Sequence, residues 1–287
     1  MRIQSLDTND DSRLSYLSHL AQPVSKLFYL SDSLSTLLDQ PLVAIVGSRK
    51  VSPYGRAVTV KIAQELARAG VVTVSGLALG VDSVAHQATL DAGGKTIAVL
   101  PSGLDNIYPA SHRNLARQIL LAGGALVSEY PAGSESPMKY QFIARNRIIA
   151  ALSKGVIVTE AAAKSGSLHT AEFALEQGKD IFAVPGNITS ATSAGTNNLI
   201  KSGATPITSS HDILEALAIS PVTKHPSYTS ANPQEIILLR LISNSVSRND
   251  DLLNASSLDP AILNQTLSML EINGAIQSDA QGAWTIA

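Results

Sequence analysis

The feature that most constrains the fold is a regular alternation of short β-branched runs with helical segments, which begins at Pro41. Strands buried on both faces read as near-continuous apolar runs, and a strand–helix alternation builds a parallel sheet covered by helices on both faces. The segments with strand composition are Leu42–Val46, Val71–Ser75, Thr96–Leu100, Ala125–Ser128, Val156–Thr159, Ile181–Val184 and Thr205–Thr208. The pattern predicts an α/β chain with an extended Rossmann-type parallel sheet.

Segments with helical periodicity lie between these runs and carry signals for helix ends. In Gly55–Ala69 the apolar residues fall along one helix face. Ser52 followed by Pro53 is typical of a helix start, and Gly70 and Gly123 are typical of helix ends. The other predicted helices are Val81–Ala92, Arg113–Ala122, Tyr140–Leu152 and Leu168–Gln177.

Length and composition predict one large and one small domain. The chain has 287 residues, 45% of them hydrophobic, which is enough to bury a full core. Residues 220–232 carry prolines among Ser and Thr, which predicts a linker. We therefore expect a lead-in segment over 1–40, a Rossmann-like domain over 41–219, the linker, and a small domain over 233–287.

The small domain has three helical patterns followed by a short ribbon. The helices are Gln234–Ser245, Asn249–Asn254 and Pro260–Asn273, and the strands are Ala275–Ser278 and Trp284–Ile286. This order indicates a winged-helix-like unit, although a generic three-helix packing unit would show much the same pattern. The third helix contains no Lys or Arg, so it is not expected to read a duplex in the major groove. Our hypothesis for this unit is contact with a protein partner.

Composition limits the compartment of the protein. The chain has no cysteine, which excludes a disulfide framework and thiolate metal sites and fits a reducing compartment. No segment approaches the roughly 20 uninterrupted apolar residues of a membrane span. The start, Met1–Leu20, has no basic stretch leading into an apolar run. These features predict a soluble, cytoplasmic protein without a membrane anchor.

A formal charge of −2 argues against a protein that coats nucleic acid with a generally basic surface. Any nucleic-acid-binding site must therefore be a local cluster of cations. The segment Ser136–Thr159 meets this demand, because it has no Asp or Glu and a net charge of +4. Its cations are Lys139, Arg145, Arg147 and Lys154.

The same segment carries Tyr140 and Phe142, which can stack on unpaired bases. The alternative interpretation is a helix start with core residues Phe142 and Ile143 and with surface arginines. Composition alone does not decide between the two.

Loops that follow parallel strands meet at one edge of the sheet, where ligands of such folds bind. The first strand leads into Gly47-Ser48-Arg49 and a helix opening near Ser52-Pro53, which offers free N–H groups and an arginine fork to an anion. The alternative is a tight turn with a solvated arginine. A second helix start on this edge offers hydroxyls and a glycine, from Ser165, Gly166, Ser167 and Thr170.

The sequence does not indicate catalysis or a cofactor. No G-x-G-x-x-G fingerprint and no metal-ligand spacing of His or carboxylates is present. Asp82 and His86 stand one helical turn apart, but an Asp on the helix dipole and a packed His is the favoured interpretation. We predict no cofactor, no metal and no enzymatic activity.

These segments together resemble the DprA/Smf family of bacterial DNA-processing proteins. The resemblance covers roughly residues 23 to 218, and its motifs occur in the family's order. They include Val43–Arg49, Ser75–Ala78 with Asp82 and Ala85-His86, Tyr108-Pro109, Ser128-Glu129, Phe142 with Arg145–Ile149, Ser165–Leu168, Phe182–Gly186 and Asn198–Ile200.

The resemblance implies a Rossmann domain that binds single-stranded DNA, acts as a homodimer, and helps load the RecA recombinase onto single strands during natural transformation and homologous recombination. Carried over by position, Ser48 and Arg49 bind a phosphate, Lys139 pairs with the backbone and Phe142 stacks on a base. The predicted DNA-binding residues are Gly47, Ser48, Arg49, Lys139, Phe142, Arg145, Asn146, Arg147, Ser165, Gly166, Ser167 and Thr170.

The sequence departs from the family pattern in three places. Many relatives begin with a small helical domain, whereas the polar first 20 residues here are too short to fold one. His169 stands where an aliphatic residue is common, and Ala88 replaces a small glycine.

Three other functions compete with DNA binding. A Rossmann-type enzyme that cleaves nucleoside monophosphates is the first, because Thr170-Ala171-Glu172 superficially matches the motif of such enzymes. Such an enzyme also needs a proton donor and a closed nucleoside pocket. A nuclease and a purely structural adaptor are the other two.

Overall fold

The computed structural model describes residues 2–134, 136–220, 232–243, 246–278 and 282–286. The chain forms two compact units, Met1–Val222 and Thr223–Ala287, which we call unit 1 and unit 2. Most of the expected linker, at 221–231, lies outside the described residues. No helix in the described ranges is both long and apolar enough to cross a membrane.

Unit 1 is built on a nine-stranded sheet in the order β1-β2-β6-β5-β4-β3-β7-β8-β9. From β3 to β9 all neighbouring strands are parallel. These strands are β3 (Leu42–Gly47), β4 (Val72–Ser75), β5 (Thr96–Leu100), β6 (Ala125–Ser128), β7 (Gly155–Glu160), β8 (Asp180–Ala183) and β9 (Thr205–Pro206). The fold class is confirmed. The strand order reverses between β3 and β7, which are neighbours, so the loops after these two strands flank the switch point.

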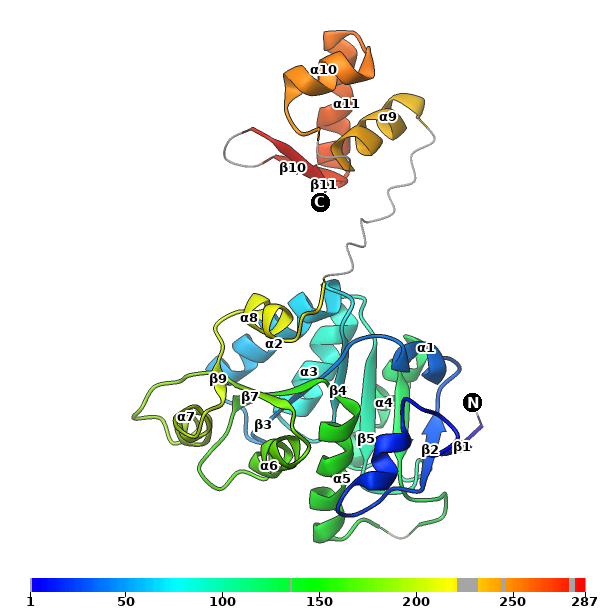
Figure 1. The fold of residues 1–287 in the computed structure, drawn as a ribbon, viewed down its shortest axis with the longest axis vertical. Helices are drawn as coiled ribbons and strands as arrows, with labels where there is room; N and C mark the ends of the chain where they lie inside the picture. Colours follow the sequence, from blue (N-terminus) through cyan, green and yellow to red (C-terminus); the bar gives the residue numbers. More distant parts are fainter. Residues whose placement is uncertain (1, 135, 221–231, 244–245, 279–281, 287) are drawn as a thin grey trace. The chain divides into compact units, whose positions relative to one another are not determined.

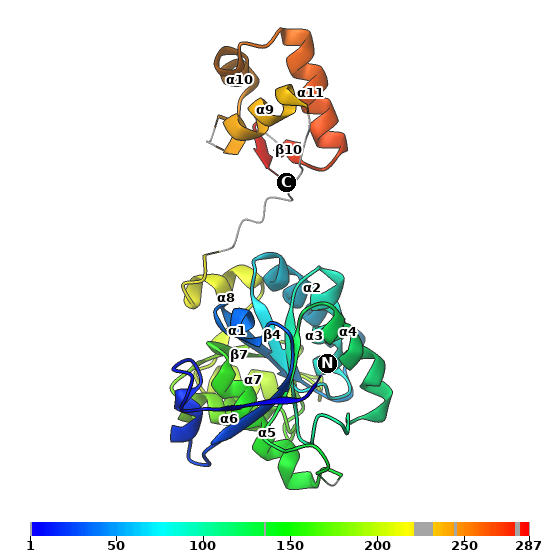
Figure 2. The same cartoon turned by 90° about the vertical axis from the view of Figure 1, so that its right-hand side faces the viewer.

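Helices cover both faces of this sheet because successive residues of a buried strand point to opposite sides. Val43 and Ile45 of β3 pack in the cluster that contains residues of α2 and α3, whereas Ala44 and Val46 pack in the cluster that contains α5 and α6. Figure 2 shows α3 and α4 on one side of the sheet and α5 and α6 on the other. The helices are α2 (Pro53–Arg68), α3 (Val81–Asp91), α4 (Arg113–Leu121), α5 (Lys139–Leu152), α6 (Leu168–Glu176), α7 (Ala194–Lys201) and α8 (Ser210–Ala216).

The first 40 residues add to the sheet, which the sequence analysis did not predict. They form β1 (Gln4–Asp7), the 3-10 helix η1 (Ser15–His19), β2 (Lys26–Leu30) and α1 (Leu34–Leu38). β2 pairs antiparallel with β6, and β1 pairs antiparallel with β2 at the sheet edge (Figure 1). Scattered leucines anchor the segment, since Leu14, Leu17, Leu27 and Leu37 are fully buried in the core.

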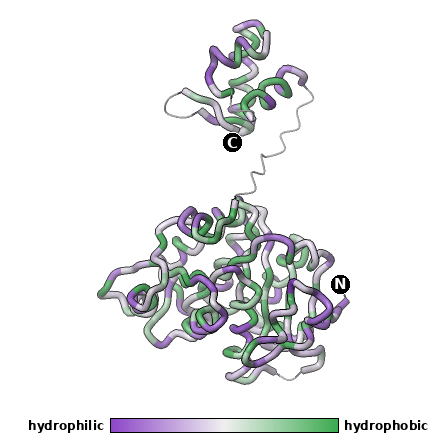
Figure 3. The backbone as a smooth tube through the Cα atoms, in the orientation of Figure 1, coloured by the Kyte–Doolittle hydropathy of each residue, from purple (hydrophilic) through white to green (hydrophobic). Residues whose placement is uncertain are grey.

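Unit 2 has three helices and a two-stranded ribbon, with bounds close to the predicted ones. Its elements are α9 (Pro233–Ser243), α10 (Asn249–Ser256), α11 (Pro260–Ile272), β10 (Ile276–Ser278) and β11 (Trp284–Ile286). Leu238, Leu252, Leu267 and Leu270 form its core, and hydrophobic residues gather on α9 and α11 (Figure 3). The Trp284 indole N–H donates to Asn249 Oδ1 at 2.6 Å, which ties β11 to α10.

Candidate functional site

A cleft of about 930 Å³ opens at the carboxyl ends of β3 and β7, within the size range of ligand sites. Every predicted DNA-binding residue except Arg147 lines it. These residues are Gly47, Ser48, Arg49, Lys139, Phe142, Arg145, Asn146, Ser165, Gly166, Ser167 and Thr170. The fold therefore brings three separate sequence segments to one place at the switch point.

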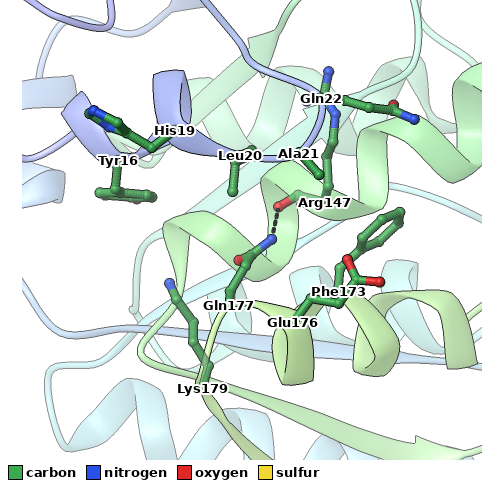
Figure 4. A pocket seen from close by; sticks show the side chains of 10 residues that line it. All are labelled: Tyr16, His19, Leu20, Ala21, Gln22, Arg147, Phe173, Glu176, Gln177 and Lys179. Carbon is green, nitrogen blue, oxygen red and sulfur yellow. Dashed lines mark hydrogen bonds between the residues drawn. The ribbon is translucent and has the colours of Figure 1, made fainter.

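Arg147 lies elsewhere. Successive residues of a helix point about 100° apart, and Arg147 leaves α5 toward a different cavity, next to Phe173 and Gln177 (Figure 4). Its Nη2 donates to Glu129 Oε2 at 2.6 Å, and its side chain is only 6% exposed. A buried, ion-paired arginine outside the cleft cannot hold a strand that lies in the cleft. The structure thus separates Arg147 from the other predicted residues.

Cations and aromatic rings meet on the rim of the cleft. The Arg49 guanidinium carbon lies 5.2 Å from the centroid of the Phe142 ring, within the range of a cation–π contact. Tyr108 approaches the same ring edge-on, with a centroid distance of 5.2 Å. The three side chains form an arginine–aromatic cluster that we call the rim stack.

The cleft residues that sequence reasoning did not predict include Tyr108, Lys50 and Lys164, whose rings or charges can contact a ligand. Tyr108 belongs to a motif of the family resemblance, and Lys50 and Lys164 each adjoin a predicted residue in the chain. Proximity in the chain was the available signal for the two lysines, and the family motif was the signal for Tyr108.

The start of α5 presents Phe142 to the cleft. Met138 N donates to Gln141 Oε1 at 2.6 Å, which fixes the first turn. Ile143 is 37% exposed, whereas Ile148 and Ile149 further along the helix are buried. The interpretation that makes Ile143 a core residue is wrong. The first turn of α5 leaves apolar and aromatic surface free for a ligand.

The start of α2 is already occupied by a carboxylate. Ser52 N donates to Glu160 Oε2 at 2.8 Å, and Gly55 N donates to the Ser52 hydroxyl at 3.0 Å. Glu160 is 2% exposed and ends β7, the neighbour of β3. The Ser52 and Gly55 N–H groups at this helix start are therefore taken up inside the protein, and the predicted phosphate contact rests on Ser48 and Arg49. Gly55 is required at this contact, since a Cβ on it would lie 2.5 Å from Glu160 Oε2.

The loop before α6 is open to a ligand. No heavy atom lies within 4 Å of the place where a Cβ on Gly166 would stand. The hydroxyls of Ser165 and Ser167 lie 2.8 Å apart, and Asn146 Nδ2 donates to Gly166 O at 3.2 Å. Thr170 is only 1% exposed, so it can act only from the floor of the cleft. Hydroxyls of this kind can bond a phosphate or a sugar.

Arg145 and Asp82 form the floor. Arg145 is 4% exposed, and its Nη1 donates to the carbonyls of Gly76 and Val99. Asp82 accepts bonds from Gly76 N at 3.1 Å and Ala78 N at 3.4 Å. Burial raises the pKa of Asp82 and lowers the pKa of Arg145 to about 10. This buried pair holds the loop after β4 in place beneath the cleft.

Residues that an enzyme would need are engaged elsewhere. His86 is fully buried, and its Nδ1 bonds to the Thr96 hydroxyl at 2.7 Å and not to Asp82. Glu172 lies on the exposed surface of α6, 2.8 Å from His169 Nδ1. Across the described parts of the chain, no group of His, Asp and Glu side chains has the arrangement of a metal site.

Comparisons with known proteins show the family and agree with the fold. Residues 5–218 match the family model of DNA recombination-mediator protein A, and residues 222–282 match that of the DprA winged helix domain. Protein Smf of Escherichia coli is 47% identical over 200 residues, which cover 68% of this chain and 53% of that protein. DNA processing protein DprA of Streptococcus pneumoniae is 47% identical over 199 residues, which cover 69% and 68%. The chain thus matches about half of the first relative and two thirds of the second.

Two solved structures resemble unit 1 closely. The X-ray structure of DprA from Streptococcus pneumoniae superposes with a TM-score of 0.68 at 43% identity, covering 75% of this chain and 74% of that one. DNA processing protein A from Helicobacter pylori, whose structure describes a single-stranded DNA binding mode, gives a TM-score of 0.66 at 36% identity, covering 76% and 96%. The chain therefore belongs to the DNA recombination-mediator protein A family, which includes the DprA and Smf proteins.

Proposed function

We propose that unit 1 binds single-stranded DNA in the cleft at the β3–β7 switch point. The observation that carries this proposal is the rim stack, in which Arg49 lies over Phe142 beside the exposed Tyr108. Stacking on aromatic rings needs a free base face, and only an unpaired strand offers one. A duplex would leave these rings without a partner.

The charge of the cleft favours a phosphate backbone. Arg49, Lys50, Lys139 and Lys164 line the cleft. Among the described residues, the one acid on its lining is Asp82, buried on the floor beside Arg145. The cleft is therefore locally positive in a chain whose net charge is −2. Phosphate and stacking contacts specify little sequence, so we expect binding to tolerate most base sequences.

Fluorescence anisotropy with labelled single- and double-stranded oligonucleotides tests this proposal. We expect Phe142→Leu, which keeps an apolar side chain but removes the ring, to weaken single-strand binding by about 1–3 kcal/mol, roughly 5- to 150-fold. Arg49→Ala should also flatten the salt dependence, since each lost phosphate contact on a single strand lowers the slope by about 0.7. Arg117→Ala, at an exposed arginine of α4 outside the cleft, is the matched control. Equal binding of duplex and single strand, or no effect of either cleft variant, would contradict the proposal.

We also propose that the protein acts as a homodimer in the cytoplasm, without enzymatic activity of its own, and mediates loading of the RecA recombinase during transformation and recombination. The matched family's name, a recombination mediator, supports this role. Light scattering tests the dimer. Recombinase ATPase activity on coated single strands, with and without Arg49→Ala protein, tests the loading. Turnover of nucleoside monophosphates that disappears in Glu172→Ala would instead establish the hydrolase alternative.

A further inference from the structure

A second cavity, of about 610 Å³, lies on the α5–α6 face of unit 1. The N-terminal segment around η1 forms one wall, and α5, α6 and the turn after α6 form the other (Figure 4). None of its lining residues lines the cleft. We call it the α6 cavity, and its volume is within the range of small-molecule sites.

The α6 cavity has a buried donor with unused hydrogen-bonding capacity. The Nη2 of Arg147 bonds to Glu129, but its Nε and Nη1 are buried and have no partner among the described residues. Buried polar groups are nearly always paired, and each one left unpaired destabilises the fold. A ligand with a carbonyl or ring-nitrogen acceptor would pair with this guanidinium.

The lining of the α6 cavity also includes a buried acceptor, on Gln177. Gln177 Nε2 donates to the Arg147 carbonyl at 3.2 Å, which turns its amide oxygen away from α5. That Oε1 is buried and has no partner in the part of the chain that the structure describes. It can accept a bond from an N–H group of a ligand. The site thus offers both a donor and an acceptor, at separate places on its lining, to a polar ligand.

Two aromatic rings provide flat apolar walls. Phe173 lies at the Arg147 end of the α6 cavity, and Tyr16 lies at the opposite end (Figure 4). The Lys179 ammonium is 5.2 Å from the centroid of the Tyr16 ring and donates to the carbonyls of Ala151 and Ser153. Flat rings of this kind stack on a planar ligand.

The charges of the α6 cavity favour a neutral ligand. Glu129 balances Arg147 directly, and Lys179 and Glu176 carry opposite charges on the same lining, with His19 counted as neutral. Burial also lowers the pKa of Lys179 to about 8, so its positive charge is held less firmly than that of a free lysine. A strongly anionic ligand would gain little here, in contrast to the positive cleft.

We propose that the α6 cavity binds a purine or pyrimidine base. Such a base is planar and uncharged, and it carries carbonyl or ring-nitrogen acceptors beside N–H donors on one edge. Arg147 would donate to the acceptor, Gln177 Oε1 would accept from the N–H group, and Phe173 would stack on the ring. This site does not depend on DNA binding in the cleft.

The base can come from a free nucleoside or from an unpaired position of a bound strand. α6 reaches both sites, because Thr170 lines the cleft and Gln177 lines the α6 cavity. These residues are seven positions apart, which corresponds to roughly 10 Å along a helix at 1.5 Å per residue. A free nucleoside and a base of a bound strand would make the same contacts, and the experiment below distinguishes between them.

Saturation-transfer NMR and calorimetry with the four deoxynucleosides, on the full-length protein, test the proposal. We expect saturable binding of at least one nucleoside and none of 2-deoxyribose. Ala21→Trp, at an exposed lining residue, should fill the α6 cavity and weaken nucleoside binding at least about tenfold, about 1.4 kcal/mol. Ala122→Trp, at an exposed alanine outside both sites, is the matched control, and Phe173→Leu is the second test variant should Ala21→Trp fail to fold.

Arg49→Ala separates this proposal from that for the cleft. It should leave nucleoside binding unchanged even where strand binding is lost. A loss of strand affinity in Ala21→Trp would identify a base of the strand as the occupant, and unchanged strand affinity would identify a free nucleoside. The proposal is overturned if no nucleoside binds up to its solubility limit, or if Arg49→Ala abolishes nucleoside binding while Ala21→Trp does not affect it.

Discussion

Single buried polar side chains fix the loops around the cleft. Arg145 lies so close to the backbone that a Cβ on Gly76 would stand 2.4 Å from its guanidinium. Glu160 occupies the start of α2 in the same way, from a position 108 residues further along the chain. Both side chains bond to other parts of the protein. The groups that remain available to a ligand are the rim side chains and the Ser165–Ser167 loop.

His86 is a residue whose burial predicts a pH effect on stability. The Thr96 hydroxyl donates its one proton to Thr73 O, so His86 Nδ1 must carry the proton that it shares with Thr96. Nε2 is then a bare acceptor, buried without a partner among the described residues. Burial lowers the pKa of His86 from 6.5 to about 3.

Between these two pKa values the unfolded chain binds a proton at position 86 and the folded chain does not. The free energy of unfolding should therefore fall as the pH drops below 6.5, by up to about 1.4 kcal/mol per pH unit from this group. His86→Asn, whose amide can still donate to Thr96, should flatten that dependence in urea titrations followed by circular dichroism. His211→Asn, at an exposed histidine, is the control. An unchanged slope in His86→Asn would show that His86 is protonated in the folded state.

At the scale of elements, burial decided what could be predicted from the sequence. Strands β3 to β8 and helices α2 to α6 were predicted within about two residues, because their apolar runs are continuous or follow one helix face. β1 was missed because three of its four residues are exposed, so it carries no apolar run. β2 is mostly apolar, but it was missed because the sequence analysis treated residues 1–40 as a lead-in segment. The carboxylate at the start of α2 was also missed, because it arrives through the pairing of β3 with β7. The location of the Arg147 side chain could not be predicted either, because it depends on the side of α5 that this position faces.

The N-terminal strand β2 contributes to stability, which Leu27→Ala tests. Leu27 is fully buried in the core cluster under α5 and α6, so its truncation should lower the free energy of unfolding by about 2–5 kcal/mol. Lys26→Ala, at an exposed position of the same strand, should change it by less than about 0.5 kcal/mol. Urea denaturation of both variants provides the comparison. Equal small effects would mean that β2 is not part of the cooperative fold of unit 1.

At the scale of the whole molecule, the proposed DNA-binding cleft and the second folding unit are separate in sequence. All residues that line the cleft fall between Val46 and Thr192, inside unit 1. In unit 2, α11 has no Lys or Arg, and several of its apolar side chains and those of α9 are exposed, such as Ile236, Met269 and Ile272. This composition fits a protein contact better than a phosphate backbone.

Deletion of residues 223–287 tests this division. Because the rim stack and the cleft cations remain, single-strand affinity should stay within about threefold of the full-length value, about 0.7 kcal/mol. The same deletion combined with Phe142→Leu should lose binding as the full-length Phe142→Leu variant does, which would show that the remaining affinity comes from the cleft. Anisotropy over a salt series measures both. A deletion that abolished strand binding while circular dichroism still showed a folded unit 1 would place part of the DNA contact in unit 2 and would overturn its assignment to a protein partner.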